Sequence, residues 1–156
     1  MRRIVAMAVV VSLAGSVLVE AVGGKNAAYV GGTVVGLKEK TEGTLSTQSE
    51  TEAVFQAKEG RALFPYSAIT GLEYGQKAGR RVAVAVLISP LALFSKKRNH
   101  YLTITYNDAA GKEQAAVFEL GKDVIRTTLK ILEVRSGKSV EFQDDEARKS
   151  GVGGGE

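Results

Sequence analysis

Hydrophobic and polar residues alternate most clearly in two neighbouring stretches of the chain. In residues 100–107, apolar residues such as Leu102 and Ile104 occupy every second position, and threonine or tyrosine stands between them. Residues 113–120 show a second run of this kind after a short link that contains Gly111. A period of two is that of a β-strand with one face on a core. The pattern therefore predicts a β-hairpin.

Five shorter stretches before this hairpin have the same character. They are rich in β-branched and aromatic residues and are separated by turn residues such as those at 58–60. Strands in globular proteins are commonly this short when hairpins follow one another closely. The expected strands are residues 29–37, 43–47, 52–57, 61–66 and 68–74. With the hairpin, the sequence predicts seven strands.

The period changes after Asp123, where apolar residues begin to recur at helical spacing. These residues are Val124, Ile125, Thr128, Leu129, Ile131 and Leu132. We expect one amphipathic helix, with Asp123 as its N-terminal cap and Gly137 in the left-handed conformation that often ends a helix. Residues 138–156 are charged and Gly-rich, and we expect them to form a peripheral tail.

Seven short strands followed by one amphipathic helix resemble a pleckstrin-homology-like (PH-like) domain. The resemblance covers residues 43–135. Gly43-Thr44-Leu45, residues 64–69 and the Gly111 hairpin are similar to the corresponding parts of bacterial PH-like and GRAM domains. It implies a mainly β (α+β) fold, a seven-stranded curled sheet or barrel closed by the C-terminal helix. It also implies binding to phosphoinositides, peptides or proteins, although alternating charges at residues 38–42 disfavour a phosphoinositide.

The N-terminus has the pattern of a secretory signal peptide. Two arginines are followed by residues 4–19, which carry no charge, and residues 19–21 suit a signal peptidase. This predicts a signal peptide at residues 1–21, a spacer at 22–28 and a PH-like domain at 29–137. An uncleaved anchor is the alternative, but the apolar run is shorter than the roughly 20 residues that span a bilayer. With no cysteine for lipid attachment or disulfides, the pattern indicates a bacterial periplasm or cell envelope.

An apolar insert separates the fifth and sixth expected strands. Residues 82–94 carry no charge, and basic residues flank them at 80–81 and at 96–98. As a helix this run would be about 20 Å long, short of the roughly 30 Å of a hydrocarbon core. Because an apolar centre with basic edges suits headgroups and acyl chains together, the pattern favours contact with an anionic membrane surface.

Two other interpretations of the insert remain open. It could pack on the domain or on another subunit, which would make the partner another protein or a second copy of the chain. It could also be an additional strand that ends at Pro90. The residues predicted to contact a membrane or partner are Arg80, Arg81, Val86, Leu87, Ile88, Leu91, Leu93, Phe94, Lys96, Lys97 and Arg98.

No motif for catalysis, cofactor binding or metal binding stands in the sequence. The single histidine, His100, is interpreted as a surface or hydrogen-bonded residue. Glu73 and Glu119 lie on expected strands, so a carboxylate-dependent enzyme is a distant alternative. Of 21 basic and 17 acidic residues, removal of residues 1–21 leaves 19 and 16, a net charge of +3. Such a mild charge does not indicate nucleic acid. The sequence predicts a non-enzymatic protein without cofactors.

Overall fold

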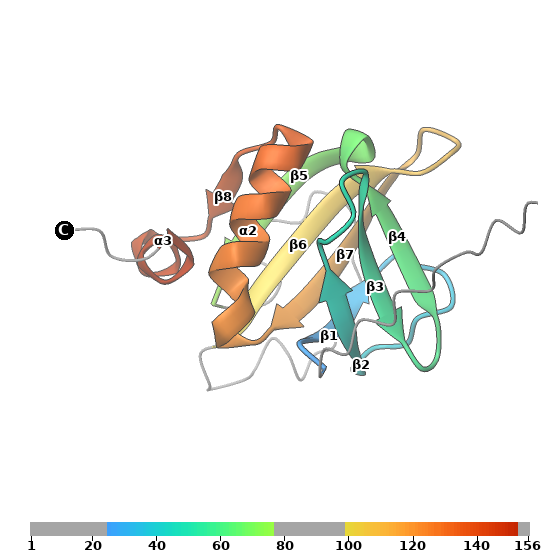
Figure 1. Cartoon of the computed structure of the whole chain (residues 1–156), viewed down its shortest axis with the longest axis horizontal. Coiled ribbons are helices and arrows are strands. Elements are labelled where there is room, and N and C mark those ends of the chain that lie inside the picture. The colour runs from blue at the N-terminus through green and yellow to red at the C-terminus, as the bar shows by residue number, and fades with distance from the viewer. Residues whose placement is uncertain (1–24, 77–98, 153–156) are drawn as a thin grey trace, which may run out of the picture.

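Strands dominate the structure, a computed structural model that describes residues 25–76 and 99–152 (Figure 1). The strands are β1 (Ala27–Gly32), β2 (Thr41–Ser46), β3 (Glu52–Ala57), β4 (Arg61–Pro65), β5 (Ile69–Gly75), β6 (His100–Asn107), β7 (Glu113–Leu120) and β8 (Val140–Phe142). The helices are α2 (Lys122–Ser136), α3 (Asp145–Val152) and the short 3-10 helix η1 (Tyr66–Ala68). The predicted mainly β class is therefore confirmed.

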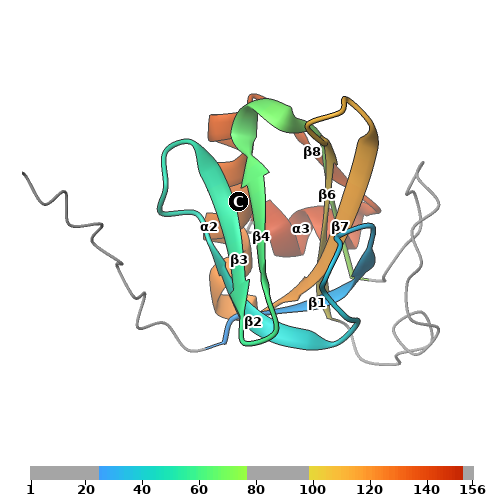
Figure 2. The same cartoon turned by 90° about the vertical axis from the view of Figure 1, so that its right-hand side faces the viewer.

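All eight described strands belong to one sheet, in the order β4-β3-β2-β1-β7-β6-β5-β8. Neighbouring strands are antiparallel except β5 and β8, which are parallel. The sheet is not closed, because β4 and β8 lie at its two ends. Figure 2 shows the sheet bent, with β2, β3 and β4 facing β6 and β7. The expectation of seven strands is wrong, since β8 adds an eighth.

The additional strand comes from the segment after Gly137, which the sequence analysis places in a charged tail. Val140 pairs with Leu72 of β5 and is 9% exposed, and Ala147 of α3 is fully buried. The backbone of α3 comes close to the sheet at Gly151, where a Cβ would lie 2.7 Å from the Phe142 ring. The sequence does not predict β8 and α3 because these elements have only three and eight residues. They contain too few apolar positions to show the hydrophobic period of a strand or a helix.

The first strand ends earlier than the sequence predicts, at Gly32 instead of residue 37. Gly32 has a φ of 137°, and the next amide, of Thr33, donates a hydrogen bond of 2.8 Å to the carbonyl of Ala115. The chain then leaves the sheet, and Val35 is 97% exposed. A glycine tolerates this φ because it has no Cβ, so the Gly-rich end of the stretch is a turn.

The ends of α2 test two sequence predictions. Asp123 is not the N-terminal cap, because the cap position is Gly121 and no side chain bonds there. Asp123 instead lies in the first turn, where a carboxylate favours the positive end of the helix dipole. Gly137 has a φ of 69° and donates its amide to the carbonyl of Glu133, so the predicted left-handed C-terminal cap is confirmed.

Aromatic rings fill the centre of the core between the two halves of the bent sheet. The Phe118 ring on β7 contacts the rings of Phe55 on β3 and Phe64 on β4, with centroids 4.9 and 5.7 Å apart. Helix α2, in front of β6 in Figure 1, covers the same core with Ile125 and Leu132, which are at most 1% exposed. The core therefore lies on the face of β6 and β7 that carries Phe118.

Arg135 ties the end of α2 to the opposite part of the sheet. Its guanidinium donates hydrogen bonds to the carbonyl oxygens of Thr47 and Ser49 and to the hydroxyl of Tyr66. It also lies 5.6 Å from the centroid of the Tyr66 ring, within cation–π distance. These partners lie on the β2–β3 link and on η1, so Arg135 connects the end of α2 to both.

Candidate functional site

The predicted contact segment connects two strands that are already direct neighbours. Gly75 at the end of β5 pairs with Tyr101 at the start of β6, and residues 76–99 join the two strands. Residues 77–98, and with them all eleven predicted contact residues from Arg80 to Arg98, lie outside the described part of the chain. Their contact with a membrane or partner stays a prediction. The same holds for the signal peptide at residues 1–21.

A chain of polar side chains lies beside this connection. The hydroxyl of Tyr74 lies 2.5 Å from Nδ1 of His100 and 2.9 Å from the hydroxyl of Ser150 on α3. The amide of Gln76 donates to the Ser150 hydroxyl at 3.3 Å, and Arg126 of α2 donates to the Ser150 carbonyl at 3.2 Å. These bonds join β5, β6, α2 and α3 at the end of the sheet where the connection begins and ends.

This chain of hydrogen bonds accommodates neutral His100. In the neutral tautomer protonated at Nδ1, His100 donates to the Tyr74 hydroxyl, Tyr74 donates to the Ser150 hydroxyl, and Ser150 donates to the carbonyl of Ala147. Burial lowers the pKa of His100 from its ordinary 6.5, and the positive charges of Lys122 and Arg126 lower it further, against a smaller opposing effect of Glu119. The interpretation of His100 as a hydrogen-bonded residue agrees with this position.

The lowered pKa of His100 predicts a loss of stability in mild acid. Unfolded chains bind a proton at His100 near pH 6.5 while folded chains remain neutral, so the free energy of unfolding falls as the pH drops below about 6.5. The fall ends at the lowered pKa of the folded state. Urea unfolding at pH 7.5, 6.5 and 5.5 measures it. His100→Gln keeps a hydrogen-bonding partner for Tyr74 but cannot titrate, and an equally steep fall in that variant would contradict the prediction.

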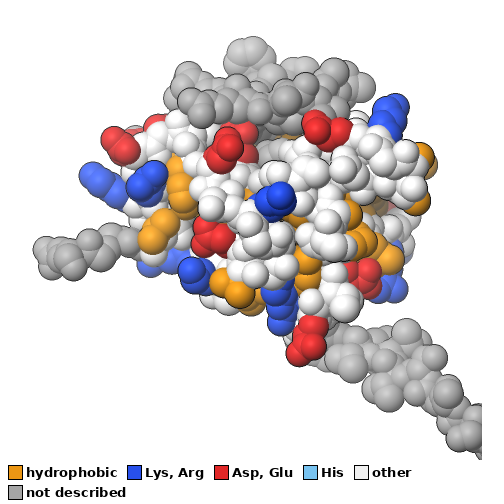
Figure 3. Space-filling model, turned by 90° about the horizontal axis from the view of Figure 1, so that it is seen from above, with side chains coloured by type: hydrophobic (Ala, Val, Ile, Leu, Met, Phe, Trp, Pro, Cys, Tyr) orange, Lys and Arg blue, Asp and Glu red, His pale blue; other side chains and the backbone are white. Residues whose placement is uncertain are grey.

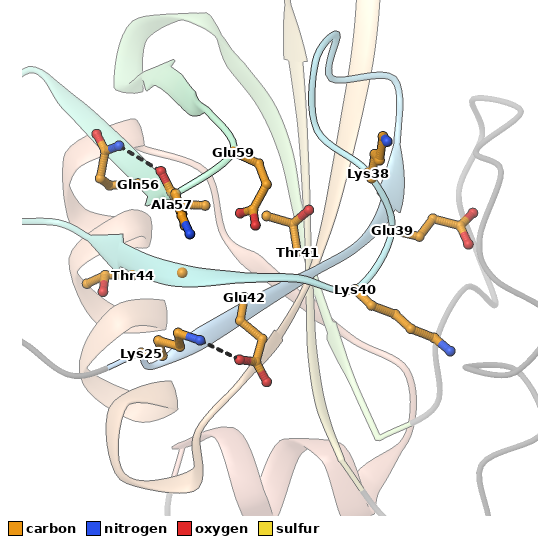
Figure 4. Close-up of a pocket in the computed structure, with 12 residues that line it drawn as sticks. Lys25, Lys38, Glu39, Lys40, Thr41, Glu42, Thr44, Gln56, Ala57 and Glu59 are labelled. Carbon is orange, nitrogen blue, oxygen red and sulfur yellow. Dashed lines mark hydrogen bonds and ion pairs between the residues drawn. The ribbon is translucent and has the colours of Figure 1, made fainter.

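A second feature is an open, charged hollow of about 550 Å³ around β2, lined also by residues of the β1–β2 link and of the end of β3 (Figure 4). Its lining contains Lys25, Lys38, Lys40, Lys58, Glu39, Glu42 and Glu59. The ammonium of Lys25 lies 2.8 Å from a carboxylate oxygen of Glu42. This hydrogen bond and the opposite charges raise the pKa of Lys25 and lower the pKa of Glu42. Since lysines and glutamates alternate, the hollow offers no concentrated positive charge to a phosphate.

The face of the protein shown in Figure 3 also carries charges of both signs. Lysine and arginine side chains are interspersed with aspartate and glutamate, and neither sign gathers into one patch on that face. Long-range steering of a highly charged polymer requires a field of one sign, which this face does not present. That nucleic acid is not a partner stays a prediction.

The two carboxylates considered for catalysis, Glu73 and Glu119, lie on the same face of the sheet but on strands separated by β6. Glu73 is opposite Thr103 and accepts a 3.1 Å hydrogen bond from Gln143, whereas Glu119 is opposite Tyr101. Neither of them lines the charged hollow around β2. Within residues 25–76 and 99–152, no group of three or more metal-binding side chains lies together.

Comparison with known proteins assigns no family. No protein-family model matches the chain, and no curated protein matches it either. The PH-like resemblance therefore remains a proposal. None of the described helices has the length and apolar character needed to cross a membrane.

Sequence reasoning missed the hydrogen-bonded group of Tyr74, His100 and Ser150. Tyr74 and His100 fall on expected strands, but Ser150 lies in the segment interpreted as a tail. The three meet because β5 and β6 pair and because Gly151 lets α3 approach the Tyr74 ring. No local pattern in the sequence reports a contact between residues 76 positions apart.

Proposed function

We propose that this protein is a non-enzymatic module of the bacterial cell envelope that contacts anionic membrane surfaces through residues 80–98. The observation that carries the proposal is the pairing of Gly75 with Tyr101. Antiparallel neighbours need only two to five residues to join them, yet this connection has 24. The sheet does not require the extra residues, which suggests that they serve a function.

The composition of the connection supports a membrane as the partner. Residues 82–94 are uncharged, and five basic residues at 80–81 and 96–98 flank them. Each basic residue near an anionic surface contributes about 1 kcal/mol, and burying a leucine side chain contributes about 1.5–3 kcal/mol. Several such contributions together are enough for a folded domain to bind vesicles reversibly.

We further propose a PH-like plan for the scaffold that carries this segment. The first seven strands follow the order β4-β3-β2-β1-β7-β6-β5, and α2 packs on the core that they enclose. The eighth strand and α3 are additions to the expected plan. In such a scaffold the paired strands β5 and β6 fix the two ends of the connection.

Membrane binding through the apolar run predicts that Leu87→Asp with Leu93→Asp lowers the affinity for anionic vesicles at least tenfold. The two aspartates remove apolar burial and repel anionic lipid. Co-sedimentation of residues 22–156 with such vesicles measures the effect. The matched control places two aspartates on exposed apolar positions of the described fold, Leu63 and Val134, which are 45% and 69% exposed. Equal pelleting of all variants would refute a role of the run.

Binding of another protein is the second candidate, and the end of the sheet favours it. Strand β4 has β3 on one side and no further described strand on the other, and its Leu63 is 45% exposed. Such an edge can pair with a strand of another chain, including a second copy. Light scattering across a range of concentrations tests pairing with a second copy. A mass that stays that of a monomer would count against self-association.

A further inference from the structure

The sheet has a second apolar surface on the side away from the core. Alternation along the strands places Phe118 and Leu102 on the core side and their neighbours on the other. We call this other side of β1, β7 and β6 the outer face. Its members are Val30, Tyr101, Thr103, Ala115 and Val117.

The outer face is closed to solvent although the core does not include it. Ala115 and Val117 are 0% exposed and Tyr101 is 3% exposed, yet none of the three belongs to the packed core. Both described α-helices bury their apolar residues on the core side, α2 through Leu132 and α3 through Ala147. The helices therefore do not account for the burial of Val117.

The sequence of β7 is that of a strand covered on both sides. Residues 115–118 read Ala-Ala-Val-Phe, without the polar positions that a strand with one wet face shows at every second residue. Continuous apolar runs are typical of strands buried on both faces. Leaving Val117 and Tyr101 in water would expose a contiguous apolar surface, which monomeric soluble proteins avoid.

We propose that residues 82–94 of the same chain dock on the outer face. The first argument is where the connection begins and ends. It leaves β5 after Gly75, which pairs with Tyr101 of the outer face, and it returns through Asn99, whose side-chain amide donates a 3.3 Å hydrogen bond to the Tyr101 hydroxyl. The face lies directly beside both ends of the segment.

The second argument is reach. Strands lie about 4.8 Å apart, so Val117, two strands from β5, is on the order of 10 Å from the start of the connection. Residues 76–99 are long enough to cross β5, β6 and β7 and return. Residues 82–94 are uncharged, so they can cover the apolar residues of the outer face and remove them from water.

The third argument is charge complementarity at the border of the outer face. Glu119 is the direct strand partner of Tyr101, and Glu73 lies opposite Thr103, so two carboxylates adjoin the apolar residues near the ends of the connection. The segment carries its basic residues at 80–81 and 96–98, outside the apolar run. Docking of the run brings these cations toward the border with Glu73 and Glu119.

This inference deepens the proposed function, on which it rests for the role of residues 82–94 in membrane contact. One side of the segment lies on the sheet, and its other side is presented to the membrane. The outer face thus determines which apolar residues of the segment lipid can reach. Docking itself needs no lipid, so it is tested in solution, apart from vesicle binding.

Cysteine cross-linking tests the docking directly, because the chain has no cysteine of its own. Val117→Cys is combined with Leu87→Cys or, in a second variant, with Ile88→Cys, so that either side of the run is sampled. A short bismaleimide should join the two cysteines within one chain, at a yield at least tenfold above that of Val134→Cys combined with the same partner. Val134 is an exposed residue of α2, which packs on the core side. A yield no higher than this control in both variants would overturn the proposal, and so would a product that links two chains.

Digestion of the unsubstituted protein provides a measurement that does not depend on a variant folding. Chymotrypsin should cleave after Leu87, Leu91, Leu93 or Phe94 at least tenfold more slowly in the full chain than in a free peptide of residues 80–98. Equal rates would overturn docking. Vesicle binding with equal rates would leave the proposed function standing without docking, whereas protection without vesicle binding would refute the function and leave docking standing.

Discussion

Phe118→Ala should lower the free energy of unfolding by about 3–5 kcal/mol, the range measured for removal of buried aromatic rings. Phe118 is fully buried, and its ring contacts those of Tyr29, Phe55 and Phe64, with centroids 4.9–5.8 Å apart. These partners lie on β1, β3 and β4, so one ring joins both halves of the bent sheet. Because domains are stable by only about 5–15 kcal/mol, the variant should be close to unfolding.

Urea denaturation measures this loss as a shift of the midpoint at constant slope. Phe118→Leu is the matched control, because it keeps an apolar side chain of similar reach and should cost much less. If Phe118→Ala lost no more stability than Phe118→Leu, the ring would not be the centre of the core. A change of slope would instead indicate that the two halves of the sheet unfold separately.

Gly32→Ala should be the most harmful methyl addition in the described part of the sheet. Gly32 has a φ of 137°, which costs a residue with a side chain about 1–3 kcal/mol. The new Cβ would also lie 2.3 Å from the backbone oxygen of Ala115, where no side chain can move aside. Since Thr33 donates to that same oxygen, the substitution should also disturb the pairing of β1 with β7.

Gly36→Ala separates the two causes. Gly36 has a φ of 87° but no atom within 4 Å of the added Cβ, so its cost should come from the backbone alone. We expect the midpoint of urea unfolding to fall clearly further for Gly32→Ala than for Gly36→Ala. Equal shifts would mean that β7 does not approach Gly32 as closely as the structure shows.

Much of the fold can be predicted from the sequence because it depends on local patterns. The alternation in residues 100–107 and 113–120 predicts β6 and β7 with their observed bounds, and Gly137 ends α2 as expected. These features depend on neighbours within a turn or a hairpin. The early end of β1 at Gly32 differs because valines at positions 34 and 35 continue a strand-like composition into a loop.

The rest depends on contacts between distant parts of the chain. Strand β8 consists of three residues and is stabilised by parallel pairing with β5, which no local pattern reports. The hydrogen bond between Tyr74 and Ser150 likewise needs α3 in place. The outer face had a signal in the unbroken apolar run at residues 115–118, but a run of four residues alone does not say what covers its second side.

Vesicle binding of the unsubstituted protein tests the central claim most directly. Residues 22–156 are mixed with anionic or neutral vesicles at low and at high salt, and the pelleted fraction is measured. The account predicts pelleting with anionic vesicles that weakens as salt screens the basic flanks, and much weaker pelleting with neutral ones. A protein that stays in the supernatant with both vesicles at both salt concentrations would contradict membrane contact through residues 80–98.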